Sequence, residues 1–207
     1  MAATPATPLW FHLLAGPNGA GKSTLYRALV REGILGPPLE FVNADLHERA
    51  HLQHMNDLLQ RSQAAQAWAN ERRTALIAAR QPFASETVFS HPSKLELIAS
   101  AQRQGYTVAL HVVALDDPQR LLRRVAQRVH EGGHSVPPER ILARYPRTMA
   151  LLAQAVQLAS VAYLYDAAET DVNADMGGPR LVAVRSGAST IEPAGALPAW
   201  ARAMLGR

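Results

Sequence analysis

The sequence contains no cysteine, which excludes a disulfide-stabilised scaffold and a metal site built from thiolates. Residues 1–8 lack the basic and apolar regions of a signal peptide, so we expect none. The apolar run over residues 9–15 is too short to cross a bilayer. Repeats and low-complexity segments are absent. With 48% apolar and 18% charged residues, we expect one globular domain over residues 1–207, cytoplasmic and without a membrane partner.

Lysine is almost absent, with Lys22 and Lys94 the only two in the chain, and arginine fills the other basic positions. The net charge is +4, but it is unevenly placed. Seven arginines and two glutamates lie between Pro118 and Thr148, a local charge of +5 that leaves the rest of the chain at −1. Positive charge confined to one segment favours contact with a compact polyanion, and we expect no nucleic-acid partner.

Apolar strands alternate with helical segments along the chain. Strands are expected over residues 9–15, 39–43, 83–89, 106–115 and 180–185. Helices are expected over residues 22–32 and 46–79, from a cap at 90–93 to Gly105, and from Pro118 onwards. This order predicts an α/β fold with a parallel sheet covered on both faces. Residues 1–7 and 186–198 are expected to be poorly ordered or loosely packed.

The strongest motif is G-x-x-x-x-G-K-[S/T], placed between an apolar strand and a helix. In such a P-loop, backbone N–H groups and the helix N-terminus bind phosphate oxygens. Lys22 is expected to neutralise the β- and γ-phosphates, and the Ser23 hydroxyl to coordinate Mg²⁺. The guanine signature Asn-Lys-x-Asp is absent, so we expect ATP and Mg²⁺ as cofactors. The nucleotide contacts are predicted at Gly16, Pro17, Asn18, Gly19, Ala20, Gly21, Lys22, Ser23 and Thr24.

Two acidic residues stand at or near the ends of expected strands. Asp45 lies two residues after Asn43, where a parallel sheet presents groups at its carboxyl edge. It can accept the proton of a substrate hydroxyl, hold Mg²⁺, or cap the following helix. Glu86 interrupts an apolar and hydroxylated strand and can bind substrate hydroxyls with Thr87 and Ser90, unless strand alternation turns it towards solvent.

Asp116 and Asp117 follow the clearest strand and can be interpreted as a Walker-B acid. Pro118 comes directly after them, which favours a helix N-cap. The three histidines 47, 51 and 54 share one helical face, but no carboxylate completes a metal site there, and a helix surface is the favoured interpretation.

The arginine-rich segment has helical spacing. Arg120, Arg124 and Arg128 form one stripe beside an apolar stripe at residues 121, 125 and 129. A second stripe, Arg140, Arg144 and Arg147, follows the turn at Gly132–Gly133, and Pro146 is expected to kink or break its helix. Two stripes joined by a hinge are typical of a lid that closes over transferring phosphates, here residues 118–148, or they are solvated helix faces.

These motifs together resemble the zeta-toxin family of P-loop kinases, in particular its short members. The resemblance covers about residues 9–166. It depends on GPNGAGKST (16–24), FVNAD (41–45), SETVFS (85–90), RVAQRVHEGGHSVP (124–137) and RYPR (144–147). The P-loop is shared by many families, whereas the glycine-glycine-histidine segment between arginines is more specific. The larger members carry Glu-Gly-Thr where this chain has Glu86-Thr87-Val88.

The resemblance implies a three-layer P-loop NTPase fold like that of nucleoside-monophosphate kinases, with a helical lid. It implies a kinase that phosphorylates a hydroxyl of a UDP-sugar such as UDP-N-acetylglucosamine, acting as the toxin of a toxin–antitoxin pair with a small helical antitoxin. Asp45 becomes the general base and Lys22, Arg128 and Arg144 further catalytic groups, with Arg124 on the nucleotide. The substrate residues become Asn43, Glu86, Thr87, Ser90, His134 and Arg147.

Two other interpretations stay open. One is a kinase of the same fold that acts on a different hydroxylated substrate, such as an antibiotic or a metabolite. The other is a nucleotide-dependent switch, which the missing guanine signature and the confined positive charge disfavour.

Overall fold

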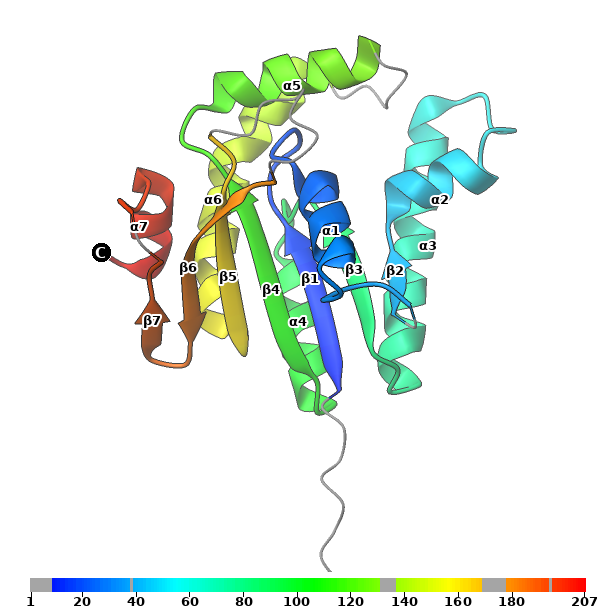
Figure 1. Cartoon of the computed structure of the whole chain (residues 1–207). Helices are drawn as coiled ribbons and strands as arrows, with labels where there is room; N and C mark the ends of the chain where they lie inside the picture. The colour runs from blue at the N-terminus through cyan, green and yellow to red at the C-terminus, as the bar shows by residue number, and fades with distance from the viewer. Residues whose placement is uncertain (1–8, 38, 131–136, 169–177, 194) are drawn as a thin grey trace, which may run out of the picture.

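The computed structural model describes residues 9–37, 39–130, 137–168, 178–193 and 195–207. Seven strands form one sheet in the order β2-β3-β1-β4-β5-β6-β7, with the P-loop strand β1 inside it (Figure 1). The first five strands are parallel, and the last two are antiparallel additions at one edge. Their bounds are β1 Trp10–Ala15, β2 Glu40–Val42, β3 Phe83–Thr87, β4 Thr107–Ala114, β5 Val161–Asp166, β6 Arg180–Ser186 and β7 Ser189–Ile191.

Helices cover both faces of the sheet and its carboxyl edge. On one face α1 packs against the strands, while α3, α4, α6 and α7 contribute to the apolar core on the other. Helix α5 crosses above the carboxyl ends of the strands, and α2 lies at the same end (Figure 1). The helices are α1 Lys22–Arg31, α2 Ala44–His51, α3 Leu58–Ala78, α4 Ser93–Arg103, α5 Pro118–His130, α6 Pro138–Leu158 and α7 Ala199–Leu205.

Strand alternation explains why two cores form. Phe11 and Leu13 of β1 pack with α3, α4 and α6, whereas Leu14 packs with α1 and α5. Side chains of β4 are buried on both faces, as a central parallel strand requires. The three-layer P-loop NTPase fold expected from the sequence is therefore confirmed.

Several boundaries differ from the expectations. The helical stretch expected over residues 46–79 is two helices, because Asp57 accepts hydrogen bonds from the N–H groups of Leu59 and Gln60 and starts α3 anew. The expected helix cap at residues 90–93 is formed: Pro92 is the N-cap residue, and Nδ1 of His91 accepts the N–H of Ser93, the first residue of α4, at 3.2 Å. Residues 186–198 were expected to be poorly ordered or loosely packed. Ser186 ends β6 and residues 189–191 form β7, so poor order is wrong for them, while the largely exposed β7 agrees with loose packing. Residues 1–7 lie outside the described part.

Candidate active site

The P-loop connects β1 to α1 and needs glycine at two tightly packed positions. A Cβ at Gly16 would lie 2.1 Å from the carbonyl oxygen of Val113, and one at Gly19 would lie 2.7 Å from that of Leu121. Both glycines have positive φ angles, 156° and 79°, which disfavour other residues. The glycines therefore let the loop pack closely against β4 and α5. A loop of this kind offers backbone N–H groups to phosphate oxygens.

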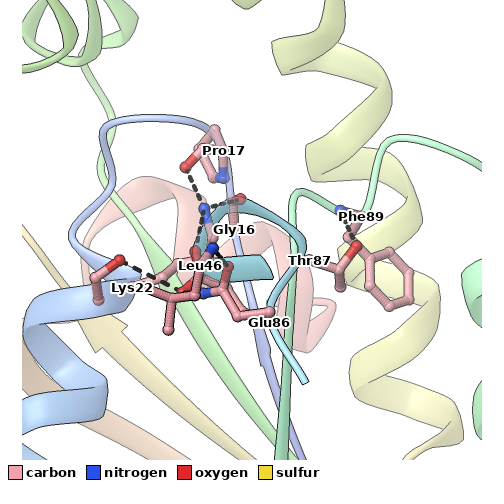
Figure 2. A network of polar contacts seen from close by, with 9 residues as sticks. Gly16, Pro17, Lys22, Leu46, Glu86, Thr87 and Phe89 are labelled. Carbon is pink, nitrogen blue, oxygen red and sulfur yellow. Dashed lines mark hydrogen bonds and ion pairs between the residues drawn. The ribbon is translucent and has the colours of Figure 1, made fainter. Parts of the chain in front are cut away.

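Lys22 begins α1 and turns its ammonium group back into the loop. Its Nζ donates hydrogen bonds to the carbonyl oxygens of Gly16 (3.0 Å) and Pro17 (3.1 Å), and lies 3.7 Å from Oε1 of Glu86 (Figure 2). The side chain is 7% exposed, and burial lowers its pKa. Nearby carboxylates oppose this shift, Glu86 first and Asp45 second, so the lysine sits among negative charge.

Glu86 is the last residue but one of β3, beside the P-loop, and its side chain is only 12% exposed. Its Oε2 accepts hydrogen bonds from Nδ2 of Asn43 (3.0 Å) and from Oγ of Ser23 (3.4 Å). Burial raises the pKa of Glu86, and the charge of Lys22 opposes the rise. The alternative in which strand alternation turns this side chain to solvent is wrong, because β3 pairs with β1 and brings Glu86 level with Leu14, just before the loop.

The junction between β2 and α2 positions Asn43 and Asp45. Asn43 is the N-cap, and its Oδ1 accepts the N–H of Leu46 at 3.1 Å. The capping alternative for Asp45 is therefore wrong, since Asp45 is the second residue of α2. Its half-buried carboxylate is close enough to Lys22 and Glu86 to act on the pKa of both. A free carboxylate in the first turn of a helix, next to the P-loop, can accept a proton.

Thr87 is the last residue of β3, and Ser90 lies in the loop that follows this strand. The N–H of Phe89 donates to Oγ1 of Thr87 at 3.2 Å, and Phe89 adopts a positive φ of 61° with its side chain fully buried (Figure 2). This contact shows Thr87 shaping the turn. Ser90 is half-buried at the end of the same loop.

Asp116 and Asp117, the candidates for a Walker-B acid, both accept hydrogen bonds from backbone N–H groups at the starts of helices. Oδ1 of Asp117 accepts the N–H of Gln119, as expected of a cap for α5. The carboxylate of Asp116 accepts the N–H groups of Ala199 and Trp200 at the start of α7. Both side chains therefore stabilise helix ends.

Helix α5 places the first arginine stripe over the P-loop. Its residues Leu121 and Val125 are buried against the core that contains α1, while Val129 is 36% exposed. Nη2 of Arg124 donates to the carbonyl oxygen of Ala167 at 2.7 Å, just after β5. Burial has the largest effect on the pKa values of Lys22 and Glu86: it lowers that of Lys22 and raises that of Glu86. The positive charge of Arg128 has a smaller effect and lowers both pKa values. Arg128 thus lies within electrostatic reach of the P-loop.

The second arginine stripe starts a helix that continues into the core. Arg144 is half-buried and Arg147 is exposed, while Leu152, Ala155 and Val156 further along α6 are fully buried. Pro146 was expected to kink or break its helix. The break does not occur, because Pro146 lies inside the continuous helix α6, with Ile141 and Thr148 buried on either side of it; the kink stays a prediction. His134 and the Gly132–Gly133 hinge lie outside the described residues.

The three histidines of α2 and its following loop do not gather ligands. His47 stacks on Trp68 with ring centroids 3.8 Å apart and contacts His51 at 4.7 Å. Within the described ranges no group of three metal-ligating side chains is found. The helix-surface interpretation is therefore the one that the geometry supports. Among the helices that the structure describes, none combines the length and apolar composition that a membrane span requires.

A family model described as an AAA domain matches residues 11–152, more than half of the chain, and includes the P-loop, Asp45, Glu86 and both arginine stripes. The chain belongs to this AAA domain family. A search of curated protein sequences finds no match.

Solved structures show where this AAA domain fold recurs. A chain from the PezAT chromosomal toxin–antitoxin system of Streptococcus pneumoniae superposes with a TM-score of 0.58 and 17% identity, over 82% of this chain and 72% of that one. A chain of the AvrRxo1-ORF1:-ORF2 complex with ATP superposes with a TM-score of 0.63 and 17% identity, over 90% of this chain and 61% of that one. A putative kinase from Chloroflexus aurantiacus J-10-fl superposes with a TM-score of 0.53 and 16% identity, over 70% of this chain and 79% of that one. At these identities the matches show that the fold is shared.

Proposed function

We propose that this AAA domain is an ATP-dependent kinase that transfers the γ-phosphate to a hydroxyl of a UDP-sugar such as UDP-N-acetylglucosamine, and that it is the toxin of a toxin–antitoxin pair. One observation carries the proposal. The P-loop lysine Lys22, the carboxylate of Asp45 and the carboxylate of Glu86 meet at one edge of the sheet, although they come from three separate segments. A phosphate site, a base and a substrate-binding acid are the parts that phosphoryl transfer requires.

The residues present fit a nucleotide with Mg²⁺. The glycine backbone and Lys22 would hold its phosphates, and the Ser23 hydroxyl would be a magnesium ligand, with Glu86 as the acceptor that orients this hydroxyl. The bound ion would supply charge neutralisation at the phosphates. Glu86 and Asn43 are already hydrogen-bonded to each other, so an acceptor hydroxyl placed here would be oriented by a rigid pair.

Asp45 would take the proton from the acceptor hydroxyl. Its position in the first turn of α2, beside Lys22, keeps a carboxylate at the edge where the γ-phosphate would lie. Arg128 of α5 and Arg144 of α6 would stabilise the charge that develops on the transferred group, with Arg124 on the nucleotide side. Thr87, Ser90, His134 and Arg147 are proposed to contact the acceptor.

The UDP-sugar and the toxin role are supported by the motif resemblance and by the fold shared with the PezAT chain. A small helical antitoxin would cover the nucleotide site. The alternative is a kinase for another hydroxylated molecule; the fold shared with the putative Chloroflexus aurantiacus kinase is compatible with it. A nucleotide switch is the least supported, because it would not require a carboxylate such as Asp45 beside the P-loop.

The deciding experiment is a screen of ATP consumption against nucleotide sugars, followed by mass spectrometry of the products. We expect a product one phosphate heavier than a UDP-sugar, formed by the wild-type chain and not by Asp45→Asn. If a sugar or an aminoglycoside without a nucleotide supports ATP consumption, and no UDP-sugar does, the alternative acceptor replaces the proposed one. ATP bound without transfer to any hydroxyl would favour the switch.

A further inference from the structure

Two cations meet behind β3, on the sheet face opposite α1. Arg73 of α3 is 3% exposed; its Nη1 donates to Oγ of Ser85 (3.0 Å) and its Nη2 donates to Oδ1 of Asn70 (2.6 Å). Lys94 of α4 donates from Nζ to the same Oδ1 of Asn70 at 3.0 Å. One amide oxygen therefore serves two positive charges that come from different helices.

Among the described residues, no carboxylate forms an ion pair with Arg73 or Lys94. In the ranges that the structure describes, all their hydrogen bonds go to neutral oxygens. Burial lowers the pKa of Arg73 to about 10, while burial and, secondarily, the charge of Arg73 lower the pKa of Lys94 to about 8. A buried charge is stable when a counter-charge accompanies it, and two unneutralised cations in contact raise the cost further. An anion bound between them would remove this cost.

The pair is anchored to the proposed acceptor site. Ser85, which accepts from Arg73, donates its own hydroxyl hydrogen to the carbonyl oxygen of Val42 at 2.9 Å. Ser85 directly precedes Glu86, and Val42 directly precedes Asn43. Ser85 and Glu86 are consecutive in β3 and point to opposite faces of the sheet, so the cations lie on the face behind Glu86, held by the same two strands that carry Glu86 and Asn43. Asn70 is exposed and Lys94 is half-buried, so this part of the cluster lies at the surface.

A purely structural role explains Arg73 but not Lys94. Arg73 ties α3 to β3 through Ser85, and one cation suffices for that tie. Lys94 adds repulsion and contributes a single bond to an exposed amide. A planar guanidinium beside a flexible ammonium is, however, a typical arrangement for phosphate oxygens.

We infer that Arg73, Lys94 and Asn70 form an oxyanion site that binds the phosphate or diphosphate group of the acceptor, an assignment that rests on the proposed kinase function. Arg73 would offer its guanidinium edge and Lys94 its ammonium group. Rotation of the Asn70 amide would turn its NH₂ group towards the anion. Such a site selects acceptors that carry phosphate at a distance from the reacting hydroxyl, as a nucleotide sugar does.

The first test follows the reactivity of Lys94 and needs no catalysis. Because the chain has only two lysines, an amine-reactive reagent at about pH 8 and mass spectrometry report on Lys94 separately from Lys22. The P-loop is kept filled with a non-hydrolysable ATP analogue, and inorganic pyrophosphate or UDP-N-acetylglucosamine is added. We expect saturable protection of Lys94 by both compounds. Unchanged labelling of Lys94 at every concentration would overturn the site.

Variants separate this site from general charge effects. Arg73→Gln should abolish the protection, and Asn70→Asp, at an exposed position, should do the same if Arg73→Gln does not fold. Arg103→Gln is the matched control, because Arg103 lies on α4, the helix of Lys94, is exposed and pairs with Glu96. Loss of protection in Arg103→Gln as well would overturn the inference. Protection by pyrophosphate but not by UDP-N-acetylglucosamine would identify a site for free phosphate and overturn the assignment to the acceptor.

The second test is kinetic and uses the full chain. Lys94→Gln should raise KM for the UDP-sugar by about tenfold and leave kcat within about threefold, because the contact is equally present in the ground and transition states. An unchanged KM would overturn the inference even where the wild type is active. Conversely, protection of Lys94 by pyrophosphate in a chain that phosphorylates no UDP-sugar would contradict the proposed acceptor and leave the oxyanion site standing.

Discussion

The ammonium nitrogen of Lys22 lies 3.7 Å from Oε1 of Glu86, and the two side chains are 7% and 12% exposed. Each charge counteracts the burial of the other, since burial lowers the pKa of Lys22 and raises that of Glu86. The same carboxylate accepts a hydrogen bond from Ser23. A phosphate that enters the loop would compete with Glu86 for Lys22. This pair therefore connects the nucleotide side of the site to the acceptor side.

Lys22→Ala is expected to lower turnover by at least about a hundredfold, because a phosphate contact that strengthens in the transition state is lost. The fold should survive, since Lys22 contacts loop carbonyls and Glu86 rather than the apolar core. Steady-state kinetics and thermal melting measure the two effects. Arg27→Ala, at an exposed position further along α1, is the control and should retain activity. Near-normal turnover of Lys22→Ala would contradict the role of the P-loop.

Asp45→Asn should lower turnover by about 10²–10⁴-fold while ATP still binds, because the amide keeps the shape of the side chain but cannot accept a proton. Kinetics with nucleotide titration tests this expectation. Glu71→Gln, an exposed change on α3, controls for the loss of one negative charge. If ATP affinity falls together with turnover, Asp45 binds the magnesium ion or has a structural role, and it is not the base.

Expression of the active chain in a walled bacterium should cause lysis, because phosphorylation of a UDP-sugar would remove a precursor of the cell wall. Asp45→Asn, expressed at the same level, should be harmless. Growth curves and microscopy after induction measure the difference. Normal growth with the active chain would contradict the toxin role and favour the alternative acceptor.

The parallel strands and the P-loop could be predicted because their signals are local. The apolar run before Gly16 and the helical pattern after Lys22 place the loop without any tertiary information. Strand β5 was missed, since it starts two residues after the C-cap of α6 and no turn signal separates them. The split between α2 and α3 was missed for a similar reason: the surrounding alanine-rich pattern hid the capping role of Asp57.

Parts of the candidate site depend on contacts between distant segments. Glu86 was correctly singled out as a charge in a strand, but its bonds to Ser23 and Asn43 follow from the pairing of β3 with β1 and β2. Arg73 gave no signal at all, because an arginine in a helix is usually exposed. Its burial against Ser85 follows from how α3 packs on the sheet. The roles proposed for the individual arginines of α5 and α6 stay predictions.

The stability of the fold should decrease at mildly acidic pH because of two adjacent histidines. Nδ1 of His12 and Nε2 of His111 lie 3.2 Å apart on β1 and β4. Burial lowers the pKa of His12 to about 4 and, with a smaller effect of His12, that of His111 to about 3. The unfolded chain takes up protons near pH 6.5, whereas the folded chain does not, so the free energy of unfolding falls as the pH drops from about 6.5 towards 4.

We expect His111 to contribute about 2 kcal/mol to this loss between pH 6.5 and 5. Denaturant unfolding across this range measures it, and His111→Leu should flatten the slope. His54→Leu, at an exposed position, is the control and should leave the slope unchanged. An identical slope in wild type and His111→Leu would show that other groups cause the acid sensitivity.

The last prediction concerns the arginines above the P-loop. Arg128 is on α5, near enough to Lys22 and Glu86 to change the pKa of both, and Arg144 is half-buried in the first part of α6. A guanidinium binds phosphate oxygens in a bidentate way that an ammonium group cannot reproduce. Arg128→Lys and Arg144→Lys should therefore each lower kcat by more than about tenfold, roughly 1.4 kcal/mol of barrier.

The affinity for ATP in the open enzyme should change little, because these contacts form when both substrates are bound. Kinetics of the single variants, together with nucleotide titration, separates the two effects. Arg123→Lys on α5 and Arg140→Lys on α6 are matched controls: Arg123 is exposed and pairs with Asp117, and Arg140 is exposed one turn before Arg144. If Arg128→Lys and Arg144→Lys turn over as fast as these controls, the two stripes are solvated helix faces and residues 118–148 do not act as a catalytic lid.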